Sequence, residues 1–148
     1  MQSCKSRPAF TMLELVFVIV VIGILASVAM PKLWVTRDDA IIAKGRSDVA
    51  TIRGSISTMK QKNLLEGNST LLPAELDSAS NNTENEELFS KILDYPIYSK
   101  SGDGHWMKTD TTKYSYKVMG NSVVFTYNPA TGRFDCDHSE EYCRKLTH

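Results

Sequence analysis

A long apolar run near the N-terminus constrains this chain more than any other feature. Residues 15–30 read LVFVIVVIGILASVAM and contain no charged side chain. One carboxylate, Glu14, comes directly before the run. A charged group inside a membrane costs roughly 2.5–3.5 kcal/mol on insertion scales and usually has a partner. Glu14 therefore requires a cation, and none follows within the apolar run.

The run has the length of a membrane-spanning helix. The 21 residues from Phe10 to Met30 would form a helix of about 31 Å, close to the thickness of the bilayer core. Lys5 and Arg7 precede it, which favours a cytoplasmic N-terminus. A cleaved secretory signal is the alternative, but no convincing cleavage site follows the run. We therefore predict a single membrane pass over residues 10–30.

The missing cation appears if a peptidase cuts the chain between Ala9 and Phe10. The new N-terminal amine would then lie one helical turn from Glu14. It could pair with Glu14 of the same chain or with Glu14 of a neighbouring subunit.

Residues 5–33, which begin KSRPA-FTMLEL, resemble the class III signal of type IV pilins and type II secretion pseudopilins. In that family a prepilin peptidase removes the leader, here residues 1–9, and methylates the new amine, here that of Phe10. The family's conserved glutamate, here Glu14, neutralises the amine of a neighbouring subunit during assembly. Ala9 stands where the family usually has glycine.

The resemblance also implies an architecture. Gly23 and Pro31 fall at the positions where the family loosens its helix. The implied fold is α+β and pilin-like, with a long N-terminal helix packed on a small C-terminal antiparallel sheet.

The sequence after Pro31 continues a helical pattern. Apolar positions recur every three or four residues, which is typical of one face of an amphipathic helix. These positions are Ile41, Ile42, Gly45, Val49, Ile52, Ile56 and Met59. We predict one helix from Phe10 to about Lys62, with residues 31–63 as its amphipathic half. Residues 64–148 would then form the periplasmic globular part.

The globular part begins with loop composition up to residue 85. We predict a short helix over residues 86–93, capped by Thr83 or Asn85 and ended by Pro96. Residues 99–110 are polar and rich in glycine, and predict a loop with His105 and Trp106 at its surface.

Alternating apolar residues in the C-terminal third predict three short strands. They cover residues 114–118, 123–127 and 133–136. Gly120-Asn121 predicts a tight turn between the first two strands. An amphipathic helix would cover one face of this sheet, which fits the implied α+β fold.

The chain has three cysteines, of which Cys4 lies in the predicted leader. Cys136 and Cys143 remain as a pair, and a disulfide suits a domain outside the cytoplasm. The pair also resembles the C-terminal disulfide loop of many type IV pilins. The alternatives are a zinc site that includes His138 and His148, or two free thiols.

Three weaker patterns occur in the globular part. Asp135 and Asp137 are calcium candidates, since the major pseudopilins often have a calcium loop, although a solvated acidic loop also explains them. Asn68 starts an Asn-Ser-Thr sequon with Glu66 upstream, which is a candidate glycosylation site. Aromatic residues could stack on single-stranded DNA, although core packing explains them as well; they are Tyr95, Tyr98, Trp106, Tyr114 and Tyr116.

No catalytic constellation is found, so no enzymatic activity is expected. With 17 basic and 17 acidic residues the formal charge is zero, and no global field favours nucleic acid. The resemblance implies a bacterial inner-membrane subunit that associates with its own copies, other pseudopilins, a prepilin peptidase and the inner-membrane assembly platform in type II secretion. The alternatives are a competence pseudopilin that handles DNA, a minor type IV pilin, or a monomeric membrane-anchored periplasmic binding protein.

Overall fold

The computed structural model describes residues 10–148, except for the side chains of residues 29–36. Two compact units divide the chain, one ending at Arg37 and the other covering Asp38–His148. Helix α1 (Met12–Leu65) supplies residues to both units. The predicted leader, with Ala9 and Cys4, lies outside the described residues.

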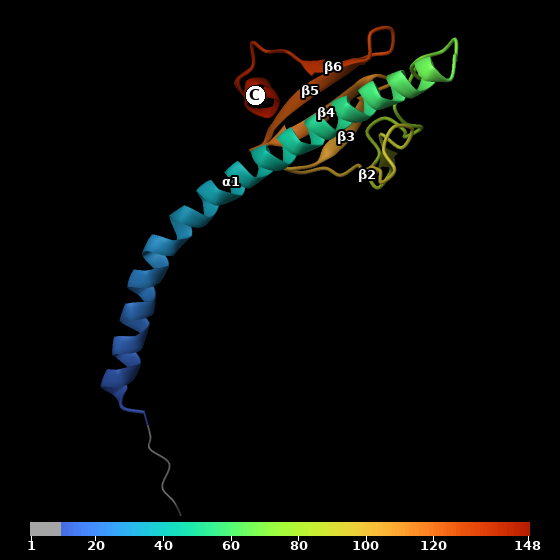
Figure 1. Ribbon diagram of the computed structural model, residues 1–148. Helices are drawn as coiled ribbons and strands as arrows, with labels where there is room; N and C mark the ends of the chain where they lie inside the picture. Colours follow the sequence, from blue (N-terminus) through green and yellow to red (C-terminus); the bar gives the residue numbers. More distant parts are fainter. Residues whose placement is uncertain (1–9) are drawn as a thin grey trace, which may run out of the picture. The chain divides into compact units, whose positions relative to one another are not determined.

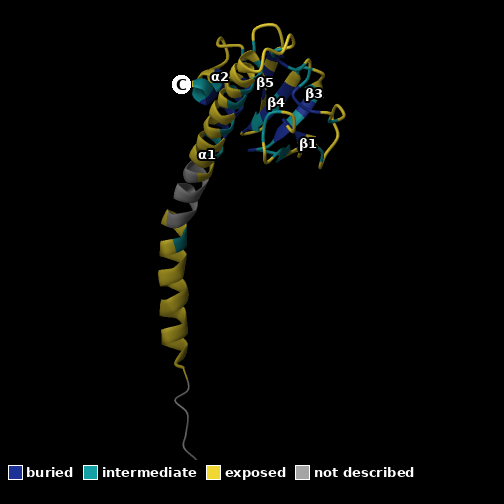
Figure 2. Ribbon diagram, turned by 45° about the vertical axis from the view of Figure 1, so that its right-hand side comes forward, coloured by how far each residue is buried: buried dark blue, intermediate teal, exposed yellow. Residues whose placement is uncertain are grey.

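In the first unit, α1 carries the apolar run and exposes it. The large hydrophobic side chains from Phe10 to Val28 are exposed, as the yellow stretch of helix in Figure 2 shows. Over the described residues, no helix is sufficiently long and apolar to cross a membrane. The membrane pass predicted over residues 10–30 stays a prediction.

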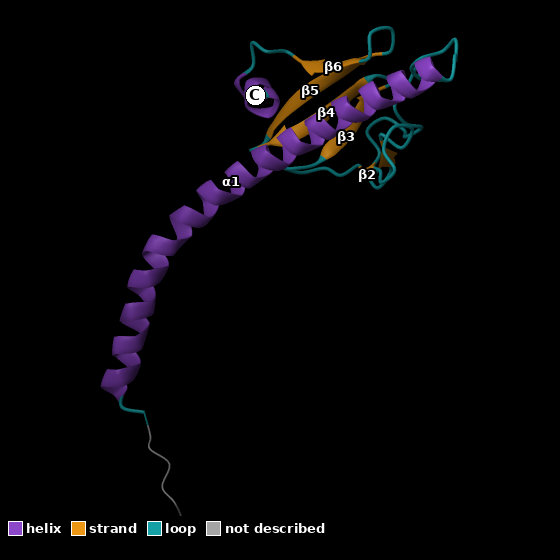
Figure 3. Ribbon diagram, viewed as in Figure 1, coloured by secondary structure: helices purple, strands orange, loops and turns teal. Residues whose placement is uncertain are grey.

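The second unit is built on a four-stranded antiparallel sheet with the order β3-β4-β5-β6. A separate two-stranded sheet pairs β1 with β2, and a short helix, α2, ends the chain (Figure 3). The strands are β1 (Glu87–Leu88), β2 (Ile97–Tyr98), β3 (Trp106–Asp110), β4 (Lys113–Val118), β5 (Asn121–Asn128) and β6 (Arg133–Cys136); α2 covers Glu141–Thr147. The predicted α+β class is confirmed.

The core lies between α1 and one face of the sheet. Alternate residues of β4 and β5 point inward, and three residues of α1 face them. The buried residues of these elements are Val49, Ile52, Ile56, Tyr114, Tyr116, Val118, Val123, Phe125 and Tyr127. The two periodicities predicted from the sequence therefore meet in one hydrophobic core.

The prediction of a short helix over residues 86–93 is wrong. Glu87 and Leu88 form β1, and Phe89 follows with a φ of 60°. The reason is tertiary: Phe89 is fully buried, and its N–H donates to Oδ2 of the buried Asp77 at 3.0 Å. Core burial and this bond outweigh the local helix preference.

The loop predicted over residues 99–110 is also wrong in part. Residues 106–110 form β3, an edge strand of the sheet. Trp106 is fully buried rather than a surface neighbour of His105, and its indole N–H donates to Asp48 Oδ2 at 3.0 Å.

The turn between β4 and β5 is one residue earlier than predicted. Val118 pairs with Asn121, so Met119 and Gly120 form the two-residue connection. Both have positive φ, 49° and 77°, which matches the twist of antiparallel strands.

Candidate functional site

The N-terminus of α1 is capped by Thr11. Its hydroxyl oxygen accepts the N–H of Glu14 at 3.3 Å, and its carbonyl accepts the N–H of Leu15 at 3.2 Å. Phe10 directly precedes this cap. A chain that began at Phe10 would therefore place its amine beside the first turn, which also contains Glu14.

Glu14 occupies the position of the acid in a capping box. Thr11 and Glu14 match the pattern Thr-x-x-Glu, in which either Glu or Gln serves. Glu14 also lies in the first turn, where a negative charge interacts favourably with the helix dipole by about 0.3–1 kcal/mol. Helix capping accounts equally well for a glutamate or a glutamine at this position. A role in assembly would differ from capping, because it would require the negative charge of glutamate.

The apolar surface that follows the cap is large. Phe10 is 75% exposed, Leu13 81% and Ile22 58%, and their neighbours up to Val28 are similarly exposed. Gly23 adds no side chain, and a Cβ there would meet no atom within 4 Å. Pro31 lies in α1, but its side chain is outside the described residues. Exposed apolar surface of this extent marks contact with lipid or with other protein.

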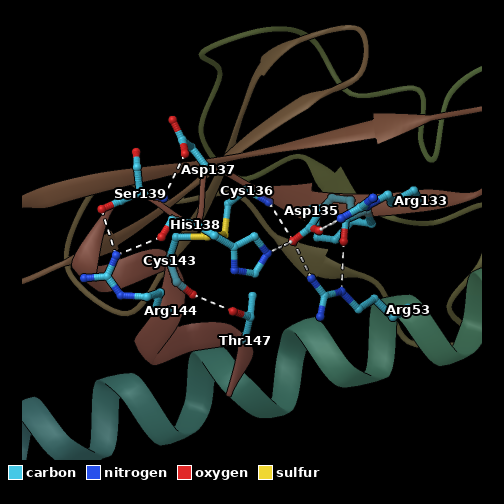
Figure 4. A network of polar contacts seen from close by, with 11 residues as sticks. Arg53, Arg133, Asp135, Cys136, Asp137, His138, Ser139, Cys143, Arg144 and Thr147 are labelled. Carbon is cyan, nitrogen blue, oxygen red and sulfur yellow. Dashed lines mark hydrogen bonds and ion pairs between the residues drawn. A yellow bond between two sulfur atoms is a disulfide. The ribbon is translucent and has the colours of Figure 1, made fainter.

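In the second unit, Cys136 and Cys143 form the predicted disulfide. Their Cα atoms are 5.9 Å apart, and the bond joins the end of β6 to α2 (Figure 4). A zinc site that uses both thiolates is incompatible with this bond. The helix α2 itself was not predicted.

Asp135, at the end of β6, collects several donors. Its carboxylate contacts Arg53 Nη2 at 2.8 Å, Arg133 Nη2 at 2.7 Å and His138 Nε2 at 3.0 Å (Figure 4). Burial opposes its ionisation, but the hydrogen bonds from Arg133, the Cys136 N–H and His138, with the charge of Arg53, outweigh burial and lower its pKa. Asp135 is therefore an ionised anchor for three side chains.

The calcium candidates Asp135 and Asp137 both have hydrogen-bond partners within the protein. The carboxylate of Asp135 already contacts Arg53, Arg133 and His138. Asp137 accepts the backbone N–H of Ser139 at 2.9 Å, and this hydrogen bond is the main reason for the lowered pKa of Asp137. Among the described residues, no group of three or more His, Cys, Asp or Glu side chains could hold a metal ion.

The other two weak predictions have different outcomes. Asn68 is exposed just after α1, and its side-chain amide donates to Glu66 Oε2 at 3.1 Å, so the sequon stays a candidate. Trp106, Tyr114 and Tyr116 are fully buried, so core packing explains them, whereas Tyr95 and Tyr98 are exposed.

Sequence reasoning missed a buried ion pair between Lys108 and Asp77. Lys108 is 3% exposed and Asp77 fully buried, and their charged groups lie 2.9 Å apart. The carboxylate also accepts the N–H groups of Ala79 and Phe89. Because Lys108 belongs to β3 and Asp77 to the segment between α1 and β3, the pair fastens this segment to the sheet. The partners are separated by 31 positions, and no motif relates them.

The fold and the capped apolar helix define a class of protein: an α+β protein with a long N-terminal helix whose first part exposes apolar side chains. Comparison with known proteins agrees. Residues 4–30 match the family model described as the prokaryotic N-terminal methylation motif. The match supports the resemblance of the N-terminal segment to type IV pilins and type II secretion pseudopilins.

Two curated relatives have the same printed name, type II secretion system core protein G. The protein from Klebsiella michiganensis is 37% identical over 59 residues, which cover 40% of this chain and 42% of the relative. The protein from Escherichia coli strain K12 is 33% identical over 63 residues, which cover 43% of each. The chain thus spans less than half the length of these relatives. No solved structure matches it significantly.

Proposed function

We propose that this chain is a pseudopilin: a structural subunit, not an enzyme, that polymerises into the periplasmic pseudopilus of a type II secretion system. The observation that carries the proposal is the position of Phe10 directly before the Thr11 cap, one turn from the Glu14 carboxylate. Cleavage before Phe10 would create the one cation that the apolar segment otherwise lacks.

The proposed role of Glu14 is to select how the subunits stack. In a low-dielectric setting an unpaired carboxylate is costly, whereas a carboxylate paired with an amine is tolerated. A neighbouring copy can supply its Phe10 amine only in certain registers along the helix. Pairing between copies would therefore set the register of the filament.

The exposed apolar side chains between Phe10 and Val28 would form the contact between subunits. Before assembly they would anchor the subunit in the inner membrane, and after assembly they would form the bundle between subunits. Gly23 and Pro31 are the proposed points at which the helix adapts to its neighbours. Both roles require water to be excluded, which apolar side chains achieve.

The proposed partners follow from the same segment. A prepilin peptidase would cut between Ala9 and Phe10, and an inner-membrane platform and other pseudopilins would receive the mature subunit. The names of both relatives favour secretion over competence or a minor surface pilus.

N-terminal sequencing and intact mass of the protein extracted from its native membranes test processing. We expect a chain that begins at N-methylated Phe10. A chain that retains residues 1–9 would overturn the proposal and favour a membrane-anchored binding protein. Filaments on producing cells, lost when the secretion genes are deleted, would support the secretion role over competence.

A further inference from the structure

We propose that the globular units of successive copies pack head to tail, with a cationic edge of one unit against an acidic edge of the next. The inference rests on the proposed function, because it requires the chain to associate with itself. It concerns the second unit alone and adds a contact surface outside the apolar helix.

The cationic edge lies where α1, β6 and α2 meet. Two adjoining hollows of about 300 Å³ and 220 Å³ occur there, and Arg53 and Thr147 line both. The side chains that we name the cationic edge are Arg46, Arg53 and Arg133. They come from α1 and β6, and Figure 4 shows Arg53 and Arg133 beside Asp135.

Positive charge exceeds negative charge on this edge. Among the described residues, Asp135 is the one carboxylate side chain that lines the two hollows, and it is shared among Arg53, Arg133 and His138. Arg46 donates through Nε to the carbonyl of Lys145, and it forms no ion pair with any residue that the structure describes. Arg133 is 73% exposed, and its guanidinium can accept a second anion.

The acidic edge surrounds β1. We define it by Glu84, Glu86 and Glu87. Each carboxylate is held by a neutral donor: Glu84 by the N–H of Ser101, Glu86 by the N–H of Ser80, and Glu87 by the hydroxyl of Tyr98 at 3.1 Å. None of the three forms an ion pair within the described part of the chain. Their charges are oriented by the fold and left without a cation.

The two charged regions lie at opposite edges of one sheet. On the acidic side, the N–H of Asn82 donates to the carbonyl of Lys108 in β3. On the cationic side, Arg53 Nε donates to the carbonyl of Phe134 in β6. The order β3-β4-β5-β6 therefore separates them by the full width of the sheet, about 14 Å at three strand spacings (Figure 1).

Opposite placement decides the geometry of association. A contact between two different surfaces leaves one cationic and one acidic edge free on every pair, so further copies can add. A two-fold symmetric dimer would instead use the same patch twice and stop at two copies. Charge complementarity between the edges thus favours an open polymer and a second copy of this chain as the occupant.

Reciprocal charge reversal in the full chain tests the contact. We expect Arg133→Glu and Glu87→Lys each to lower the yield of sheared filaments about fivefold, and their combination to restore it to within about twofold of the parent. Lys113→Glu is the matched control, because Lys113 is an exposed cation beside Asp110 and belongs to neither edge. Its filament yield should equal that of the parent.

A cysteine pair keeps the test valid if a reversal variant folds poorly. Differently tagged chains with Arg133→Cys or Glu87→Cys, both with Cys4→Ser, should cross-link to each other and not to themselves. If the parent forms filaments, every variant gives the same filament yield as the parent, and no mixed cross-link forms, the edge contact is overturned while the proposed function stands. No self-association of the parent chain would instead overturn the proposed function.

Discussion

Gly45 of α1 and Leu146 of α2 lie in such close contact that a side chain at Gly45 has no room. A Cβ on Gly45 would stand 2.5 Å from Leu146 Cδ2 and 2.6 Å from Tyr116 Cε1. The glycine costs the isolated helix about 1 kcal/mol relative to alanine, but it allows α2 and the sheet to approach α1. The disulfide between Cys136 and Cys143 fastens α2 in the same place.

Gly45→Ala should destabilise the protein by about 2 kcal/mol, because the added methyl group overpacks the contact with Leu146 and Tyr116. Gly54→Ala is the matched control on the same helix, since a Cβ there meets no atom within 4 Å. It should stabilise the protein by about 0.5–1 kcal/mol through helix propensity. Urea unfolding of the detergent-solubilised chain measures both, and equal effects of the two changes would refute the close contact.

Reduction of the disulfide should lower the free energy of unfolding by about 2.5 kcal/mol, the loop-closure value for this short loop. Helix α2 is too short to persist without tertiary contacts. We therefore expect reduction to destabilise mainly the C-terminal segment that contains α2. Melting curves with and without reductant give the change, and a chain with both Cys136→Ser and Cys143→Ser is the control. A melting temperature that reductant leaves unaltered would contradict this expectation.

Lys108→Met should cost about 3 kcal/mol, because it leaves the charge of Asp77 buried without its cation. Lys113→Met removes an exposed lysine whose charge lies 3.9 Å from Asp110, and should cost less than about 1 kcal/mol. Denaturant titration of both variants gives the comparison. Similar losses in the two would mean that burial of the Lys108–Asp77 pair has no energetic consequence.

Stability should fall with acid in a manner that depends on Asp135. Its pKa is lowered in the folded state, so the ionised carboxylate stabilises the fold above the unfolded pKa, and this contribution is lost as the pH falls through the folded pKa. Asp135→Asn should therefore flatten the fall in melting temperature between neutral and acidic pH. An unchanged pH profile in the variant would exclude this role; Asp94→Asn, which alters an exposed carboxylate outside this network, provides the comparison.

Glu14→Gln separates capping from assembly. Glutamine keeps the capping box but loses the charge that would pair with the amine of Phe10. We expect normal processing before Phe10 and helicity equal to the parent, with filament yield reduced about tenfold. Glu14→Asp keeps the charge with a shorter reach and should retain more assembly; filaments at parental yield from Glu14→Gln would remove the charge-pairing model.

Much of the fold could be predicted because it depends on local patterns. The three-to-four-residue recurrence from Ile41 to Met59 matches the buried face of α1, and the alternation in β4 and β5 matches their inward residues. The disulfide was predictable because Cys136 and Cys143 are the only cysteines after the predicted leader. The helix and strand patterns involve residues that are close in the chain, and the disulfide involves only one possible pair of cysteines.

The errors have a common physical cause, which is contact between residues distant in the chain. Phe89 leaves the helical region because Asp77 binds its N–H and the core takes its ring. Trp106 lies in a polar, glycine-rich stretch, yet Asp48 of α1 accepts its indole proton from 58 positions away.

The sequence by itself determined the N-terminal segment, the long helix and the strand pattern, because period, length and charge placement suffice for these. Only the tertiary structure decided that Lys108 is buried with Asp77, that Gly45 makes room for Leu146, and that opposite charges gather at opposite sheet edges. Such features depend on which distant segments pack together, and packing is selected by the free energy of the whole core rather than by any local window.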